Sequence, residues 1–185
     1  MRKLILISAL LFSFNGLAYN ETDLAKFKVL NACMDCDLSG ADLSDANFTG
    51  ARLTGANLEG TNLSSAILTG ANLEGTNLSS AILFNADFSS ATLIGANLDS
   101  AVSLDATLTG ANLTGATLIG AYFTGADLTG ANLIGANFTG ANLTGANLTG
   151  VDFTFALSLR NANLDSAKFC KTQMPWGEVN DDCAK

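Results

Sequence analysis

Residues 136–150 read ANFTGANLTGANLTG, three near-copies of one five-residue word. In an α-helix, residues five apart are rotated by about 140° from each other, so an apolar repeat of five would spread around the whole helix. In a straight β-strand, side chains alternate between two faces, so an odd repeat would reverse the apolar residue at every copy. The pattern is instead typical of a chain that bends at a corner every five residues.

Each word is interpreted as one side of a coil. Alanine and leucine point inward, asparagine points outward as in a very short strand, and threonine–glycine turns the corner. From Cys36 to Lys171, with one inserted residue near Phe155–Ala156, the chain holds 27 words, and the central residue is Leu or Phe in 26 of them. Ser103 is the exception. Sixteen of the 18 glycines close a word, where a corner favours a residue without a Cβ. Stacked coils share one apolar interior, so the sequence predicts an all-β repeat solenoid.

These words resemble the consensus A-(D/N)-L-x-x of the pentapeptide repeat family, over roughly three quarters of the chain. The resemblance implies a right-handed quadrilateral β-helix with four words, or 20 residues, in each coil, and therefore about seven coils. We expect a signal peptide at 1–18, a helical cap with the first cysteine at 19–35, the repeat at 36–171 and a C-terminal cap at 172–185.

The N-terminal segment has the pattern of a secretory signal peptide. Arg2 and Lys3 precede an apolar stretch from Leu4 to Phe14, and small residues follow, ending at Ala18. We expect cleavage after Ala18. A buried first strand or a membrane anchor is the alternative. No later run approaches the 18 apolar residues that a membrane span requires, so no membrane insertion is expected.

The composition is acidic, and the signal peptide predicts an exported protein. Removal of Arg2 and Lys3 leaves seven basic residues against 17 acidic ones, a net charge of −10. This charge disfavours binding to nucleic acid or to anionic lipid surfaces. The expected location is the periplasm or the outside of the cell, or the thylakoid lumen if the source is a cyanobacterium.

Four cysteines lie near the two ends of the repeat. An even number of cysteines in an exported chain indicates disulfides, and we expect the pairs Cys33–Cys36 and Cys170–Cys183. A single four-cysteine zinc site is disfavoured because the pairs lie at opposite ends of a rod roughly 30 Å long. A redox-active C-x-x-C remains the alternative for Cys33 and Cys36, although no βαβ context surrounds them.

Solenoid ends expose the core and need caps. Residues 21–32 are expected to form a short amphipathic helix over the first coil, with Leu24, Phe27 and Leu30 inward and Thr22 or Asp23 as the N-cap. At the other end, Met174 and Trp176 are expected to fold over the last coil. Family members resemble this chain at both ends, which implies caps and not a site.

No catalytic constellation is recognisable. The chain has no histidine, which removes Ser-His-Asp and Cys-His arrangements and the commonest general base. Its acidic residues lie on a convex rod without a cleft that would shift their pKa values. We therefore expect no enzyme, no cofactor and no metal.

Two outward surfaces are candidates for binding. One is a column of hydroxyl-bearing residues, which could recognise ice or a glycan: Thr49, Thr69, Ser89, Thr109, Thr129 and Thr149. The other is a small apolar patch at mid-rod: Phe84, Leu104, Ile94 and Ile134. After the inserted residue, Leu157 and Leu159 are expected to resume the inward positions.

Three functional hypotheses follow. The leading one is a non-catalytic exported solenoid that acts as a structural or protein-interaction module, with an unknown protein partner, as a monomer or an end-to-end dimer. The second comes from the resemblance, because some family members are acidic rods that mimic DNA and bind DNA gyrase; the signal peptide opposes it. The third is surface binding through the hydroxyl column.

Overall fold

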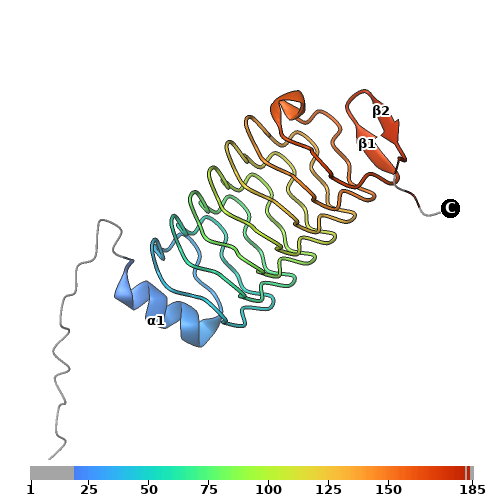
Figure 1. Cartoon of the computed structure of the whole chain (residues 1–185). Coiled ribbons are helices and arrows are strands. Elements are labelled where there is room, and N and C mark those ends of the chain that lie inside the picture. The colour runs from blue at the N-terminus through green and yellow to red at the C-terminus, as the bar shows by residue number, and fades with distance from the viewer. Residues whose placement is uncertain (1–18, 182, 184–185) are drawn as a thin grey trace, which may run out of the picture.

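The computed structural model describes residues 19–181 and residue 183, and the expected signal peptide lies outside them. Figure 1 shows a rod of stacked coils with a helix across its N-terminal end and a hairpin at its C-terminal end. The regular elements are α1 (Glu21–Leu30), the 3₁₀-helix η1 (Leu159–Asn161), β1 (Thr172–Met174) and β2 (Gly177–Val179).

Successive coils are joined by parallel β-bridges between residues 20 positions apart. These bridges run from Ala32↔Arg52 to Asn137↔Leu157. A 20-residue offset holds four five-residue words, so each coil has four sides. The structure confirms the quadrilateral coil that the family resemblance implied.

A single word shows how the backbone is satisfied. In residues 141–145, Ala141 and Leu143 are buried and Asn142 faces outward. The Asn142 N–H donates to Ala121 O one coil back (2.8 Å), and the Leu143 N–H donates to Asn163 O one coil on (2.7 Å). Adjacent N–H groups thus point in opposite directions along the rod. Every coil is hydrogen-bonded to the coils on both sides of it.

The corner of each word is built from its second, fourth and fifth residues. Asn142 Oδ1 accepts hydrogen bonds from the N–H and the hydroxyl of Thr144, at 3.0 and 2.6 Å. Gly145 then adopts a left-handed conformation, with φ of 68°. Because the second residue needs only an acceptor oxygen, Asn and Asp are interchangeable there. At Gly125 an added Cβ would also overlap the carboxylate of Asp105 in the preceding coil.

Three buried polar residues depart from the word. Thr61 and Thr76 replace the inward alanine, and their hydroxyls donate to Leu38 O and Leu53 O, each at 3.1 Å. Ser103 replaces the central leucine. Its Oγ is buried without a hydrogen-bond partner among the described residues. Buried hydroxyls are therefore tolerated by the core, and in the two threonines they are satisfied by carbonyls of the preceding coil.

The inserted residue lies later than we expected. Bridges are 20 residues apart up to Asn137↔Leu157 and 21 apart from Asn142↔Asn163 onward, so the extra residue falls between Leu157 and Asn163 and not near Phe155–Ala156. Ser158 has a φ of 55° and introduces η1 at this point.

Because the inserted residue lies later than expected, the inward orientation predicted for Leu157 is wrong. Leu159 is buried as expected, but Leu157 is 56% exposed and occupies the outward position of its word. Ala156 takes the position that we had assigned to Leu157. Alanine is the usual residue there, so the coil keeps its regular word and places the extra residue at the following corner.

At the N-terminal end, α1 covers the first coil. Its N-cap is Asn20 and not Thr22 or Asp23, since Asn20 Oδ1 accepts from the N–H groups of those two residues, at 2.9 and 3.2 Å. Phe27 is buried and stacks on Phe48 with ring centroids 4.5 Å apart. One aromatic pair thus anchors the cap to the core.

The apolar face of α1 is narrower than we expected. Leu24 packs against the core while partly exposed, whereas Leu30 is 61% exposed, so its predicted inward orientation is wrong. Three residues turn an α-helix by about 300°, so a spacing of three drifts by about 60° at each step. Leu30 has rotated off the face that Phe27 presents to the coil.

At the C-terminal end, the hairpin of β1 and β2 follows the last coil. Gln173 bridges Asp152, and Thr172 and Met174 are buried, so β1 continues the inward pattern of the repeat. Trp176, which we expected to fold over the last coil, instead lies at the hairpin turn and is 51% exposed. Met174 alone covers the core as predicted.

The inward column should carry the stability of the rod. Phe123 is fully buried, so Phe123→Ala should lower the free energy of unfolding by roughly 3–5 kcal/mol. Asn142→Ala leaves an outward corner where water can replace the lost contacts, and it should lower the free energy by less than about 1 kcal/mol. Urea denaturation of the two variants beside the parent protein measures both values, and comparable midpoints would contradict the assigned register.

Candidate functional site

Both disulfides have the pairing expected from the sequence, Cys33–Cys36 at the start of the rod and Cys170–Cys183 at its end. Cys33 and Cys36 are buried. Thiol–disulfide exchange requires access to a sulfur atom, so burial disfavours a redox role for this C-x-x-C. The two bonds are best described as closures of the caps.

The predicted apolar patch is only half correct. Phe84 and Leu104 are exposed and lie one coil apart at the same corner, where the Asn85 N–H donates to Leu104 O at 2.9 Å. Ile94 and Ile134 lie two words further round, which in a four-sided coil is the opposite corner, and they are half-buried. The structure therefore does not bring them into one patch with Phe84.

A different set of residues completes the surface around Phe84 and Leu104. Ile82, Val102 and Tyr122 are bridged to one another in three consecutive coils, at the outward position usually held by Asn or Asp. Tyr122 is half exposed. We call the resulting surface the apolar face; it comprises Ile82, Phe84, Val102, Leu104 and Tyr122. The 20-residue spacing of the outward apolar residues is the sequence signal that would have identified it.

Carboxylates border the apolar face on both sides. At the preceding corner, Asp99 Oδ1 accepts the N–H of Ile119 at 2.8 Å, and Ile119 extends the exposed apolar surface. At the following corner, Asp105 directly succeeds Leu104. No Lys or Arg occurs in any word on this side of the rod, from residues 41–45 to residues 162–166. The surface is therefore apolar in its centre and acidic at its edges.

The hydroxyl column is formed as predicted in position, but its hydroxyls are engaged. Five of the six donate hydrogen bonds to outward Asn or Asp side chains: Thr49, Thr69, Ser89, Thr129 and Thr149. Each acceptor belongs to the same word, except that Thr69 donates to Asp87 of the next coil. These hydroxyls serve the corner turns, which leaves them fewer donors for an external ligand.

Among the described residues, Asp37, Asp42 and Asp87 have lowered pKa values, through hydrogen bonds of the corner turns and of adjacent coils. The pKa of Asp37 is lowered by the hydroxyl and N–H of Ser39, and that of Asp42 by those of Ser44. At Asp87 burial raises the pKa, but hydrogen bonds from Ser89 and Thr69 outweigh it. Lowered values keep these carboxylates ionised, so they act as acceptors in turns and not as proton donors.

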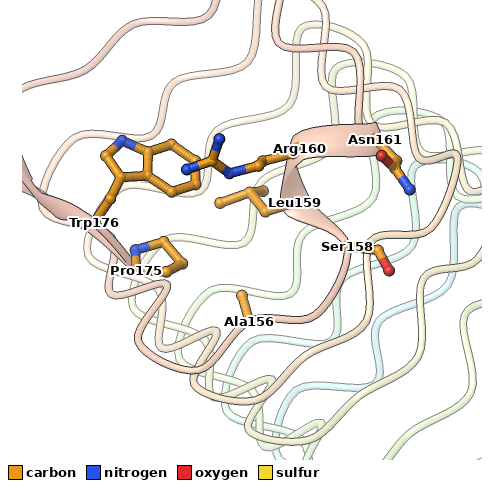
Figure 2. A pocket seen from close by; sticks show the side chains of 7 residues that line it. All are labelled: Ala156, Ser158, Leu159, Arg160, Asn161, Pro175 and Trp176. Atoms are coloured by element: carbon orange, nitrogen blue, oxygen red, sulfur yellow. The ribbon is translucent and has the colours of Figure 1, made fainter.

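A shallow pocket of about 440 Å³ opens beside the one-residue insertion. Figure 2 shows its seven lining residues, which come from the insertion and from the hairpin turn: Ala156, Ser158, Leu159, Arg160, Asn161, Pro175 and Trp176. The Arg160 guanidinium carbon lies 4.9 Å from the centroid of the Trp176 ring, a cation–π contact. This pocket was missed from the sequence because it is formed by the residues around the insertion, and the insertion was assigned to the wrong position.

Two absences concern residues 19–181 and 183. No group of three or more Cys, Asp or Glu residues in that part of the chain is arranged to hold a metal ion. None of its helices is long and apolar enough to cross a membrane.

Comparison with solved structures finds matches that include pentapeptide repeat proteins. A pentapeptide repeat protein, Rfr23, from the cyanobacterium Cyanothece 51142 is 26% identical over 83% of this chain and 97% of its own, with a TM-score of 0.34. A pentapeptide repeat protein from the Arabidopsis thaliana thylakoid lumen is 32% identical over 65% of this chain and 68% of its own, with a TM-score of 0.26. QnrB1, a plasmid-mediated fluoroquinolone resistance protein, is 26% identical over 74% of this chain and 79% of its own, with a TM-score of 0.35.

Those TM-scores are too low to support an argument, and a search of curated proteins found no match. The family model described as pentapeptide repeats, in contrast, matches in eight copies that extend from residue 33 to residue 175. The matched segments are 33–70, 66–99, 86–125, 118–156 and 131–175. They cover well over half of the chain, and the 20-residue bridges agree with them. The chain therefore belongs to the pentapeptide repeat family.

Proposed function

We propose that this protein is a non-catalytic, exported interaction module whose apolar face binds a partner protein. The observation that carries the proposal is the replacement of the polar outward residue by Ile82, Val102 and Tyr122 in three consecutive coils. An acceptor oxygen at this position stabilises the corner turn in neighbouring words, so each apolar replacement gives up those hydrogen bonds. Contiguous exposed apolar surface on an otherwise polar protein is typical of interaction sites.

The chemistry of the surface restricts the partner. An apolar centre excludes water and provides affinity, and a charged rim sets orientation and the rate of encounter. Because Asp99 and Asp105 border the apolar face and no Lys or Arg shares this side of the rod, the complementary partner carries aliphatic or aromatic side chains flanked by Lys or Arg.

The two alternative functions have less support. A DNA mimic needs carboxylates arranged along tracks, whereas Asp37, Asp42, Asp87 and Asp152 lie on four different sides of the rod. The hydroxyl column has few free donors, because five of its six hydroxyls donate to outward Asn or Asp side chains. Neither surface has the uniform composition that recognition of an extended ligand requires.

Export rests on two observations. The N-terminal segment has the composition of a signal peptide with cleavage after Ala18, and all four cysteines are paired in disulfides, which persist in oxidising compartments. The periplasm, the exterior of the cell and the thylakoid lumen all satisfy both conditions.

Intact mass of the chain recovered from its native host tests export. The expected species begins at Tyr19 and comes from a periplasmic, secreted or lumenal fraction. Its mass should rise by about 4 Da on reduction, because each of the two disulfides takes up two hydrogens. A full-length, reduced chain in the cytoplasm would contradict export and would restore the gyrase hypothesis to first place.

Consensus-restoring substitutions test the apolar face without endangering the fold. Ile82→Asn with Tyr122→Asn recreates the usual word, so the variant should fold at least as well as the parent protein. Ile67→Asn makes the same kind of change, from an exposed apolar residue to Asn, on another side of the rod and is the matched control. A photo-crosslinking residue at Val102 first captures and identifies the partner. Binding of that purified partner should then weaken by at least about 10-fold in the double variant and stay unchanged in the control.

Two results would contradict this proposal. One is equal crosslinking from Asn112, which lies on the opposite side of the rod. The other is a partner whose crosslinked segment is acidic or lacks apolar side chains, because such a segment does not match the composition of the apolar face.

A further inference from the structure

We propose that the pocket at the C-terminal end of the rod binds a carboxylate carried on an apolar body. This site is separate from the apolar face and does not depend on the proposed function. Three irregularities of the repeat meet here: the inserted residue with Ser158 in a left-handed conformation, the turn of the hairpin, and an arginine stacked on a tryptophan. Departures from the rule of a scaffold are where binding sites are expected.

Arg160 supplies the anion-binding group. Its guanidinium is held over the ring of Trp176, and it makes no hydrogen bond or ion pair within the described part of the chain. Stacking engages the face of the guanidinium and leaves the N–H donors at its edge free. Those donors match the two oxygens of a carboxylate, and stacking reduces the entropy lost on binding. None of the seven lining residues is acidic, so no internal carboxylate competes for these donors.

The rest of the pocket provides apolar contact. Figure 2 shows Leu159 beneath Arg160, with Pro175 and Trp176 on one side and Ala156 below. Leu159 is buried, whereas half of Trp176 is exposed. A ligand with an aliphatic or aromatic body could pack against Trp176 and Pro175 while its carboxylate reaches Arg160.

Phe155, which is not one of the lining residues, is an exposed aromatic residue with a left-handed backbone conformation. It closes its word with a φ of 58° and is 76% exposed. A left-handed conformation is unfavourable for a bulky residue. Because Phe155 is exposed, burial of its side chain does not offset this cost. The bridge between Asp152 and Gln173 places Phe155 in the corner column of Trp176, one coil earlier. A ligand bound in the pocket with its apolar body directed toward this corner column could also contact Phe155.

The required chemistry occurs in two sources. One is a free small carboxylic acid, and the other is the C-terminal residue of a peptide chain with an apolar side chain. Both present a carboxylate next to an apolar group. The peptide terminus adds an amide, for which Ser158 and Asn161 at the edge of the pocket offer polar side chains.

Fluorescence reports directly on the site because Trp176 is the only tryptophan in the chain. The probes are N-acetyl-phenylalanine, its uncharged amide, 3-phenylpropanoate and inorganic phosphate, each titrated into the full disulfide-bonded protein. We expect saturable changes in emission with the two carboxylates only. Arg160→Gln should weaken their binding by at least about 10-fold, and Arg160→Lys should restore it in part because it keeps the charge but not the planar fork. Arg52→Gln, at the other end of the rod, is the matched control and should bind as the parent protein does.

Each outcome decides the proposal. Binding of both carboxylates, or of 3-phenylpropanoate alone, supports it with a free acid as the source, and binding of N-acetyl-phenylalanine alone supports it with a peptide terminus as the source. Equal binding of the amide, equal binding of inorganic phosphate, or no saturable change with any probe at millimolar concentration would overturn it. Retention of carboxylate binding in Arg160→Gln would overturn it as well.

Discussion

The hydrogen bonds between coils are the constraint on which the rest of the structure depends. Within one word, the N–H of the outward residue donates to the previous coil and the N–H of the central residue donates to the next. This pattern is satisfied when successive coils have the same four sides, and the one inserted residue is absorbed at a corner. It favours a five-residue word with a left-handed residue at each corner, and in most words an acceptor side chain stabilises the turn. The inward column of Leu, Phe and Ala is then buried without any long strand or helix to organise it.

The same constraint explains where function can reside. Inward residues and corner residues are committed to the coil, whereas the second position of each word loses only its turn hydrogen bonds when it changes. Ile82, Val102 and Tyr122 show that the rod accepts apolar residues there in three consecutive coils. At the C-terminal end, one extra residue is absorbed by a short 3₁₀-helix, and the displaced backbone brings Arg160 over Trp176. Both surfaces arise from departures from the repeat that leave the hydrogen bonds between coils in place.

The inward register was predictable from the sequence because the words repeat so regularly. The four-sided coil was implied by the family resemblance, and both disulfide pairs were expected from the position of the cysteines at the two ends of the repeat. Residues such as Phe123 and Leu143 could be placed by counting in fives. The insertion could not be placed, because Leu157 and Leu159 are both apolar and either register satisfies a pattern of inward leucines. Ala156 decides between the two registers. The bridge Asn137↔Leu157 keeps the 20-residue offset, so Ala156 occupies the inward position that alanine usually holds.

The surfaces were less predictable than the core. The prediction that Ile94 and Ile134 share a patch with Phe84 was wrong. Residues two words apart lie at opposite corners of a four-sided coil, so their side chains cannot form one surface. The inward orientation predicted for Leu30 was wrong because residues three apart are offset from each other around a helix. The N-cap Asn20 lies one residue before the predicted helical range of 21–32, outside the segment in which a cap was sought. In each case the core pattern was read correctly, and the error concerned residues that the core does not constrain.

The central claim is that the chain advances by one coil every 20 residues. Spin labels on outward positions of one side test it directly, with Asn72→Cys paired in turn with Asn112→Cys, Asn132→Cys and Asp152→Cys. The native cysteines are all in disulfides, so only the introduced thiols react. The coil register predicts that the label separation increases by about 4.8 Å with each step of 20 residues. Separations that fail to rise by a constant step along this series would contradict the four-word coil.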